Sequence, residues 1–244
     1  MPPDNEQKMV LLAGASGFVG NLAVTSLLES PDIARVYAVT RRPLGRENAR
    51  LANRIVSFEQ IESQLKGLTC HAALCALGTT IRQAGSQEAF RQADIDAVLA
   101  FARAAKAAQA QRLVVVSSAG ADPAAKNFYL RTKGEMEEAL QGVGFASLDI
   151  LQPGLLLGWR GHIRPVELLG AVIMPLVNPF LTGKREHFRA IPAHTVAAAM
   201  VGAIRSGRRG VQRYTFSGIQ ALARLKPGRP MPVRPESRRT EPPR

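Results

Sequence analysis

Three evenly spaced glycines directly after a short apolar stretch constrain the fold of this chain more than any other feature. Met9–Ala13 has the composition of a β-strand, and Gly14-Ala15-Ser16-Gly17-Phe18-Val19-Gly20 follows it without a gap. The amphipathic stretch Val19–Leu28 then predicts a helix. This order of strand, glycine-rich turn and helix is typical of the first unit of a dinucleotide-binding domain, and it argues against a glycine turn in a nucleotide-free fold.

Each glycine has its own steric role in such a turn. Gly14 permits the tight turn, Gly17 lets the backbone approach a pyrophosphate, and Gly20 lets the helix pack close to the strand. Free amides near the helix start face the phosphates, at the positive end of the helix dipole. The residues that we expect to contact a dinucleotide here are Gly14, Ser16, Gly17, Phe18, Val19 and Gly20.

Short apolar runs alternate with longer amphipathic stretches along the rest of the chain, which predicts a parallel sheet with crossover helices. The further strands are expected at Arg35–Val39, Arg54–Phe58, His71–Leu77, Leu113–Val116, Ser147–Leu151 and Val211–Phe216. The further helices are expected at Gln87–Gln109, Asn127–Leu140 and Thr195–Ile204. The predicted fold class is therefore α/β, a doubly wound and mostly parallel sheet (Rossmann) with a small C-terminal substrate region.

We expect four segments in the chain. Residues 1–8 form an N-terminal tail, 9–154 the nucleotide-binding core, and 155–218 a substrate region with the final core elements. Residues 219–244 are expected to be a disordered basic tail, since six prolines and seven basic residues lie after residue 221. The apolar segment 166–181 is short for a bilayer span, and we interpret it as a pocket wall or as the face of a homodimer or protein partner. A membrane-surface contact is the less favoured alternative.

The net charge of +13 resembles that of a nucleic-acid-binding protein, but its distribution argues against that class. Residues 205–244 hold eleven of the 32 basic residues and only two of the 19 acidic ones, so the excess lies in one terminal stretch. Two cysteines are too few for a disulfide scaffold, and no Cys or His pattern completes a metal site. The polar N-terminus is unlike a signal peptide, and we expect a cytoplasmic location.

The residues after the second predicted strand indicate which dinucleotide is bound. An NAD-binding domain places an acidic residue there to hold the ribose hydroxyls, but this chain has Thr40-Arg41-Arg42. Arginine forms forked, charge-assisted bonds to phosphate, so Arg41 and Arg42 suit the 2′-phosphate of NADP(H). Two solvated loop arginines are the alternative interpretation.

A Tyr-x-x-x-Lys pattern supplies groups for acid–base chemistry. Tyr129 and Lys133 lie four residues apart in a predicted helix and therefore share a face. A nearby ammonium stabilises a phenolate, so Lys133 would lower the pKa of Tyr129 and could also hold the nicotinamide ribose. A strand ending in Ser117-Ser118 lies just upstream. We expect Ser118 to orient a substrate carbonyl, with Ser117 as the alternate.

Together these motifs resemble the short-chain dehydrogenase/reductases over residues 9 to about 218, and more narrowly the atypical group that includes the Tat-interacting oxidoreductase. The narrower resemblance rests on the glycine motif, Thr40–Arg42, Ala76–Thr80, Ser117–Asp122, Tyr129–Glu135 and Pro153–Leu157. It implies NADPH bound in a Rossmann domain, Leu77 and Gly78 lining the cofactor, and Leu155 and Arg160 touching it. Tyr129 and Lys133 would face the nicotinamide ribose.

The resemblance has two departures. Gln152 stands before Pro153 where the group would carry Arg, and His194-Thr195 stand where related chains often carry an acidic residue. The sequence thus predicts an NADPH-dependent oxidoreductase acting on a small carbonyl or alcohol through Ser118, Tyr129 and Lys133. The alternative is an NADPH-sensing regulatory protein with little or no turnover, since some members of the group serve mainly as regulators.

Overall fold

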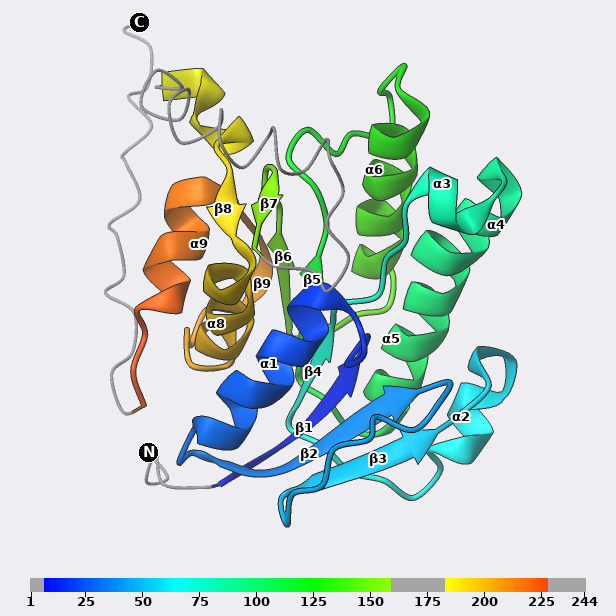
Figure 1. Cartoon of the computed structure of the whole chain (residues 1–244), viewed down its shortest axis with the longest axis vertical. Coiled ribbons are helices and arrows are strands. Elements are labelled where there is room, and N and C mark those ends of the chain that lie inside the picture. The colour runs from blue at the N-terminus through cyan, green and yellow to red at the C-terminus, as the bar shows by residue number, and fades with distance from the viewer. Residues whose placement is uncertain (1–6, 159–182, 228–244) are drawn as a thin grey trace, which may run out of the picture.

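A parallel seven-stranded sheet forms the centre of the computed structural model, which describes residues 7–158 and 183–227 (Figure 1). Its order is β3-β2-β1-β4-β5-β6-β9. The strands are β1 (Lys8–Ala13), β2 (Ile33–Thr40), β3 (Leu51–Ile55), β4 (Ala72–Cys75), β5 (Arg112–Val116), β6 (Ser147–Leu151) and β9 (Gly210–Tyr214). A separate parallel pair is formed by β7 (Leu156–Leu157) and β8 (Ile191–Pro192).

Helices cover both faces of the sheet (Figure 1). One face carries α1 (Phe18–Glu29), α8 (Ala193–Ile204) and α9 (Phe216–Ala223). The other carries α4 (Gln87–Arg91), α5 (Ala97–Ala107) and α6 (Phe128–Gln141). Shorter elements are α2 (Ile61–Gln64), α3 (Ile81–Ala84) and the 3₁₀ turns Phe58–Gln60 and Gly183–Phe188.

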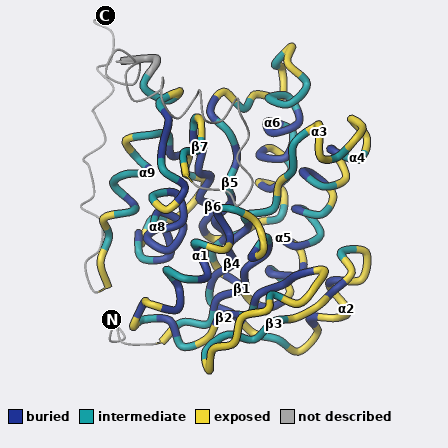
Figure 2. The backbone as a smooth tube through the Cα atoms, in the orientation of Figure 1, coloured by how far each residue is buried: buried dark blue, intermediate teal, exposed yellow. Residues whose placement is uncertain are grey.

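The two covered faces explain why the central strands are apolar without alternation. In β1, Val10 and Leu12 pack into the core under α1 and α8, whereas Leu11 and Ala13 pack into the core under α5 and α6. Successive side chains of a strand point to opposite faces, so both sets must be apolar. Figure 2 shows this burial along the middle of the sheet. The predicted doubly wound Rossmann fold is confirmed.

The strand order places a binding crevice at the carboxyl ends of β1 and β4. From β1 the chain proceeds to β2 and β3 on one side, then returns to β4 and continues outward on the other. Such a reversal leaves a crevice between the loops that follow the two central strands, and open α/β sheets bind their ligands there.

Two predicted elements are corrected. The third strand is Leu51–Ile55 and not Arg54–Phe58. β3 is a partly exposed edge strand in which Asn53 and Arg54 interrupt the apolar residues, whereas Val56 and Phe58 continue the apolar pattern beyond its end. The predicted long helix Gln87–Gln109 contains a π-helical segment, Gln92–Asp96, between α4 and α5.

The predicted start of the disordered tail at residue 219 is also wrong. Residues 216–223 form α9, in which Ile219 and Leu222 are fully buried. A Cβ on Gly202 of α8 would lie 1.9 Å from the carbonyl oxygen of Leu222, so the two helices touch through their backbones. The rest of the predicted tail, 228–244, and the segment 166–181 lie outside the described residues.

Candidate active site

The glycine loop lies in the crevice between β1 and β4. Gly14 has φ +83°, and a Cβ on it would lie 2.4 Å from the carbonyl oxygen of Ala76, which follows β4. A Cβ on Gly20 would lie 1.9 Å from the Gly14 carbonyl oxygen. Only glycine therefore allows the loop to touch both the neighbouring strand's loop and its own helix, as expected for these two positions.

The start of α1 fits the pyrophosphate of a dinucleotide. Its cap residue is Gly17, whose amide donates to the Gly14 carbonyl oxygen at 2.8 Å and which has no side chain to occupy the first helical amides. The first turn contains no acidic residue, so the positive end of the helix dipole is not neutralised there. Val19 is buried in the core, which leaves its backbone as the group that can face a ligand. Phe18 lies against Gly158.

The loop after β2 presents the two predicted arginines to solvent. Thr40 is buried and its hydroxyl donates to the Arg42 carbonyl oxygen at 2.7 Å, while Asn53 of β3 donates to the Thr40 Oγ1 at 2.7 Å. Arg41 and Arg42 are exposed, and neither guanidinium forms a hydrogen bond or ion pair with a residue that the structure describes. Their guanidinium groups are thus available to an anion at the end of β2.

A buried ion pair links α6 to the π-helical segment. Nζ of Lys133 lies 2.5 Å from Oδ1 of Asp94, and both side chains are almost fully buried. The other oxygen, Oδ2, accepts the Thr79 amide at 3.0 Å. At this distance the Lys133 ammonium donates to Oδ1 and supplies its counter-charge, and no other group in the described chain donates to that oxygen. Burial alone would lower the pKa of Lys133, but Asp94 and then Tyr129 raise it, and the net pKa is raised.

This pair faces the predicted cofactor-lining residue Gly78. A Cβ on Gly78 would lie 3.6 Å from Oδ1 of Asp94 and 3.7 Å from Nζ of Lys133. Gly78 is exposed and Leu77 is partly buried, and both follow β4 at the binding crevice. The ammonium of Lys133 therefore lies next to the loop that follows β4.

Tyr129 and Ser118 are both accessible at this end of the sheet. Tyr129 lies in the first turn of α6, partly exposed, with its ring centroid 5.7 Å from that of Phe90. Ser118 follows β5, and within the described part of the chain its hydroxyl has only a long contact, 3.4 Å, to the Ala119 carbonyl oxygen. The loop between them folds back on α6, since the Asp122 amide donates to the Leu130 carbonyl oxygen at 3.2 Å.

Ser117 is engaged in a different network. Its buried hydroxyl donates to Oε1 of Glu137 at 2.6 Å. Glu137 also accepts from the amide of Gln152 at 2.8 Å and from Nε of Arg213 at 3.0 Å. Arg213 comes from β9 and supplies a guanidinium to this buried carboxylate, while Gln152 occupies the position where the family resemblance would place Arg.

The remaining predicted residues lie farther along the chain. Leu155 has an exposed side chain, and its carbonyl oxygen accepts the Ile191 amide at 2.8 Å. Arg160 lies outside the described residues. Burial raises the pKa of both Cys70 and Cys75 to about 12, which makes these thiols poor nucleophiles.

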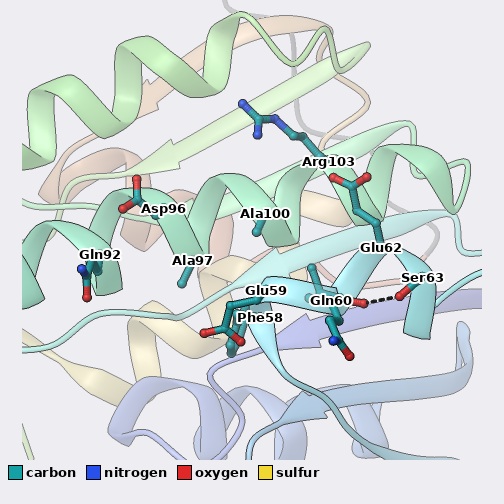
Figure 3. A pocket seen from close by; sticks show the side chains of 11 residues that line it. Phe58, Glu59, Gln60, Glu62, Ser63, Gln92, Asp96, Ala97, Ala100 and Arg103 are labelled. Carbon is teal, nitrogen blue, oxygen red and sulfur yellow. Dashed lines mark hydrogen bonds between the residues drawn. The ribbon is translucent and has the colours of Figure 1, made fainter.

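A groove of about 790 Å³ lies apart from these residues (Figure 3). Its walls come from the segment around α2, with Glu59 and Glu62, and from the π-helical segment and α5, with Asp96 and Arg103. None of its lining residues belongs to the predicted site. Within the described residues no group of three or more His, Cys, Asp or Glu could hold a metal ion, and no helix could cross a membrane.

Comparison with known proteins gives a consistent family. The NAD(P)H-binding family model matches residues 14–206. The mitochondrial protein Fmp52 of Aspergillus fumigatus is 35% identical over 80% of this chain and 86% of its own length. Protein HTATIP2 of Rattus norvegicus is 32% identical over 80% of this chain and 81% of its own length.

A solved structure supports the same fold. MoeE5 in complex with UDP-glucose and NAD superposes with a TM-score of 0.63 at 18% identity, over 85% of this chain and 75% of that chain. The predicted cytoplasmic location is contradicted by the relatives, because the Fmp52 proteins are named mitochondrial. The sequence prediction rested on a polar N-terminus unlike a secretory signal peptide, a feature that does not distinguish the cytoplasm from a mitochondrion.

Proposed function

The chain belongs to the NAD(P)H-binding family and, within it, to the atypical short-chain dehydrogenase/reductases of the HTATIP2 group, and we propose that it is an NADPH-dependent oxidoreductase. Its reaction is the reduction of a small carbonyl compound or the reverse oxidation of an alcohol. The observation that carries this proposal is the buried Lys133 ammonium, held by Asp94 beneath Gly78 and four residues from Tyr129.

Residues at the binding crevice offer contacts for both the pyrophosphate and the nicotinamide ribose of the cofactor. The glycine loop and the uncapped start of α1 would hold the pyrophosphate, and Leu77, Gly78 and Lys133 the nicotinamide ribose. When bound, NADPH supplies the hydride for a carbonyl carbon. The chain's own task is then to orient the carbonyl and to deliver a proton to its oxygen.

Three side chains perform that task. The Ser118 hydroxyl donates a hydrogen bond to the carbonyl oxygen, because no strong internal bond occupies it. The Tyr129 hydroxyl donates the proton, and the resulting phenolate is stabilised by the Lys133 ammonium. Ser117 is a positioning residue instead, since its hydroxyl is bound to Glu137.

The preference for NADPH rests on the loop after β2. A 2′-phosphate carries negative charge and accepts forked hydrogen bonds, which an exposed arginine can donate. Arg41 and Arg42 are exposed, and no acidic residue stands at the end of β2 to repel the phosphate. Both features favour NADP(H) over NAD(H).

Replacing Tyr129 by Phe tests the proposal. The variant removes the proton donor and leaves the ring packed near Phe90, so turnover with a responsive aldehyde or quinone should fall by at least about 10²-fold while NADPH affinity stays nearly constant. Turnover is followed as loss of NADPH absorbance, and affinity by nicotinamide fluorescence. Wild-type turnover in Tyr129→Phe would remove Tyr129 from the mechanism.

One observation favours a second candidate function, an NADPH-sensing regulatory protein with little turnover. The Asp94 carboxylate lies 2.5 Å from the Lys133 ammonium and offsets the charge that would otherwise stabilise a Tyr129 phenolate. This candidate predicts tight NADPH binding without turnover over a broad panel of aldehydes and quinones. A substrate that the wild type reduces, and that Tyr129→Phe reduces much more slowly, would favour the oxidoreductase over the regulatory protein.

A further inference from the structure

A small hollow lies between the glycine loop and the loop after β2. It has a volume of about 170 Å³, and its polar lining comes from Ser16 of the glycine loop, Asn21 of α1 and Arg46 of the loop after β2. Pro43 forms part of the apolar wall. Dinucleotide-binding folds place the adenosine ribose between these same two loops. The hollow is therefore next to the position of the 2′-oxygen of that ribose.

The side chain of Arg46 is held at the rim of this hollow by a hydrogen bond to Thr25 of α1. Nη1 donates to Oγ1 of Thr25 on α1 at 3.0 Å, and the Thr25 hydroxyl in turn donates to the Asn21 carbonyl oxygen at 3.3 Å. The backbone of the loop is also fixed, because the Leu44 amide donates to Oδ1 of Asn53 at 2.9 Å. The side chain of Arg46 thus loses less rotamer freedom on binding an anion than a freely moving arginine would.

The lining has the chemistry of an anion subsite. It contains one guanidinium, one hydroxyl and one amide, and it contains no carboxylate. A water molecule takes up about 30 Å³, so the hollow is large enough for a group of a phosphate's size. Arg46 follows Arg42 by four residues in the same loop, which adds a third positive charge to the two already exposed there.

We propose that Arg46, held in place by Thr25, is a specificity-determining residue that binds the 2′-phosphate together with Arg41 and Arg42. The inference rests on the proposed NADPH preference and extends it to a residue outside the motif at the end of β2. Thr25 acts only through Arg46 and is a positioning residue.

The test measures how much the 2′-phosphate contributes to nucleotide binding. Adenosine 2′,5′-bisphosphate and adenosine 5′-monophosphate differ only by that group, so the ratio of their dissociation constants, measured by calorimetric titration of the full chain, isolates its contribution. Arg46→Gln should raise the dissociation constant of the bisphosphate about tenfold and leave that of the monophosphate within about twofold of the wild-type value. Arg46→Lys should recover part of the loss, and Thr25→Val should cause a smaller loss of the same kind.

Arg35→Gln is the matched control, because Arg35 is exposed on β2 near the ring of Tyr37 and does not line the hollow. It should change neither dissociation constant. An unchanged ratio in Arg46→Gln, with the bisphosphate still preferred by the wild type, overturns the role of Arg46 and leaves the proposed function standing. Equal binding of the two nucleotides by the wild type overturns both the inference and the NADPH preference.

Discussion

At the scale of single residues, the pair formed by Asp94 and Lys133 determines what charge lies beneath the predicted nicotinamide site. A buried ammonium without a partner would lose its proton, because burial disfavours the charged form. Asp94 outweighs this effect, so the pKa of Lys133 is raised and the ammonium stays charged at neutral pH. The carboxylate is itself fixed by the Thr79 amide. Asp94 therefore positions Lys133 and maintains its charge.

Asp94→Asn keeps the acceptor for the Thr79 amide and removes the counter-charge. Leaving a buried cation unpaired should lower the free energy of unfolding by about 3 kcal/mol, measured by urea denaturation at pH 7. Because Asp94 raises the pKa of Lys133, the variant should lose the ammonium at lower pH, and the basic limb of the kcat profile should shift to lower pH. Asp94→Glu keeps the charge and serves as the control. An unchanged basic limb would contradict the pairing.

Alanine substitutions at the two neighbouring serines should have opposite effects on kcat and on stability. Ser118→Ala should lower kcat by about 10²-fold with little change in stability, because its hydroxyl makes only a long internal contact. Ser117→Ala removes a buried hydrogen bond to Glu137 and should lower the free energy of unfolding by about 1–2 kcal/mol, with most of the kcat retained. Steady-state kinetics and denaturant unfolding on both variants separate the roles. The reverse pattern would exchange the two assignments.

Sequence patterns predicted the site residues that belong to local motifs. They did not predict the residues that reach the site from other elements of the fold. Asp94 was missed although a signal was present: it lies four residues after Phe90 and three before Ala97, so an acidic residue stands within the apolar stripe of the predicted helix. Glu137 and Arg213 come from distant elements, α6 and β9. No local pattern joins them, so their contact could not be predicted from spacing.

At the scale of elements, departures from regular patterns decided which predictions failed. The central strands were predicted because burial on both faces requires continuous apolar runs, whereas the edge strand β3 has no such run. The π-helical segment between α4 and α5 interrupts the single long helix that the sequence predicts, and it carries Asp94, which pairs with Lys133 of α6. Ile219 and Leu222 of α9 were assigned to the predicted tail because a basic and proline-rich sequence follows them.

An ion pair between elements gives a pH-dependent prediction. Both Nε and Nη2 of Arg205, after α8, donate to the carboxylate of Asp32, before β2, at 2.8 and 2.6 Å. Burial raises the pKa of Asp32, but the bond and charge of Arg205 outweigh it, so the pKa is lowered from 3.8. The stabilisation is therefore present at pH values above 3.8 and is lost as the pH falls through the folded-state pKa.

Asp32→Asn should accordingly lower the free energy of unfolding by about 1 kcal/mol at pH 7, and the difference from the wild type should shrink toward zero in strong acid. Denaturant unfolding of both proteins from pH 7 down to about pH 3 measures this difference. Asp122→Asn is the control, because among the described residues its exposed carboxylate accepts only the Ala124 amide, two residues away. A difference that stays constant with pH would show that the pair does not couple folding to protonation.

At the scale of the whole molecule, the doubly wound sheet brings the motifs together. The glycine loop after β1 touches the backbone after β4, and the loops after β2 and β5 add the exposed arginines and the serines. In a parallel sheet all these loops lie at the carboxyl ends of the strands, which is why motifs spread over residues 14–133 can serve one ligand. β9 and α8, from the C-terminal part, complete the same sheet and its cover.

The most direct test is a titration of the purified protein with NADPH and NADH, followed by nicotinamide fluorescence, with Arg41→Asp in parallel. We expect the wild type to bind NADPH at least about tenfold more tightly than NADH. The Arg41→Asp variant should lose that preference while still binding NADH, because the glycine loop is unchanged. Absence of NADPH binding at millimolar concentration, or equal affinity for the two nucleotides in the wild type, would contradict the proposed NADPH-dependent function.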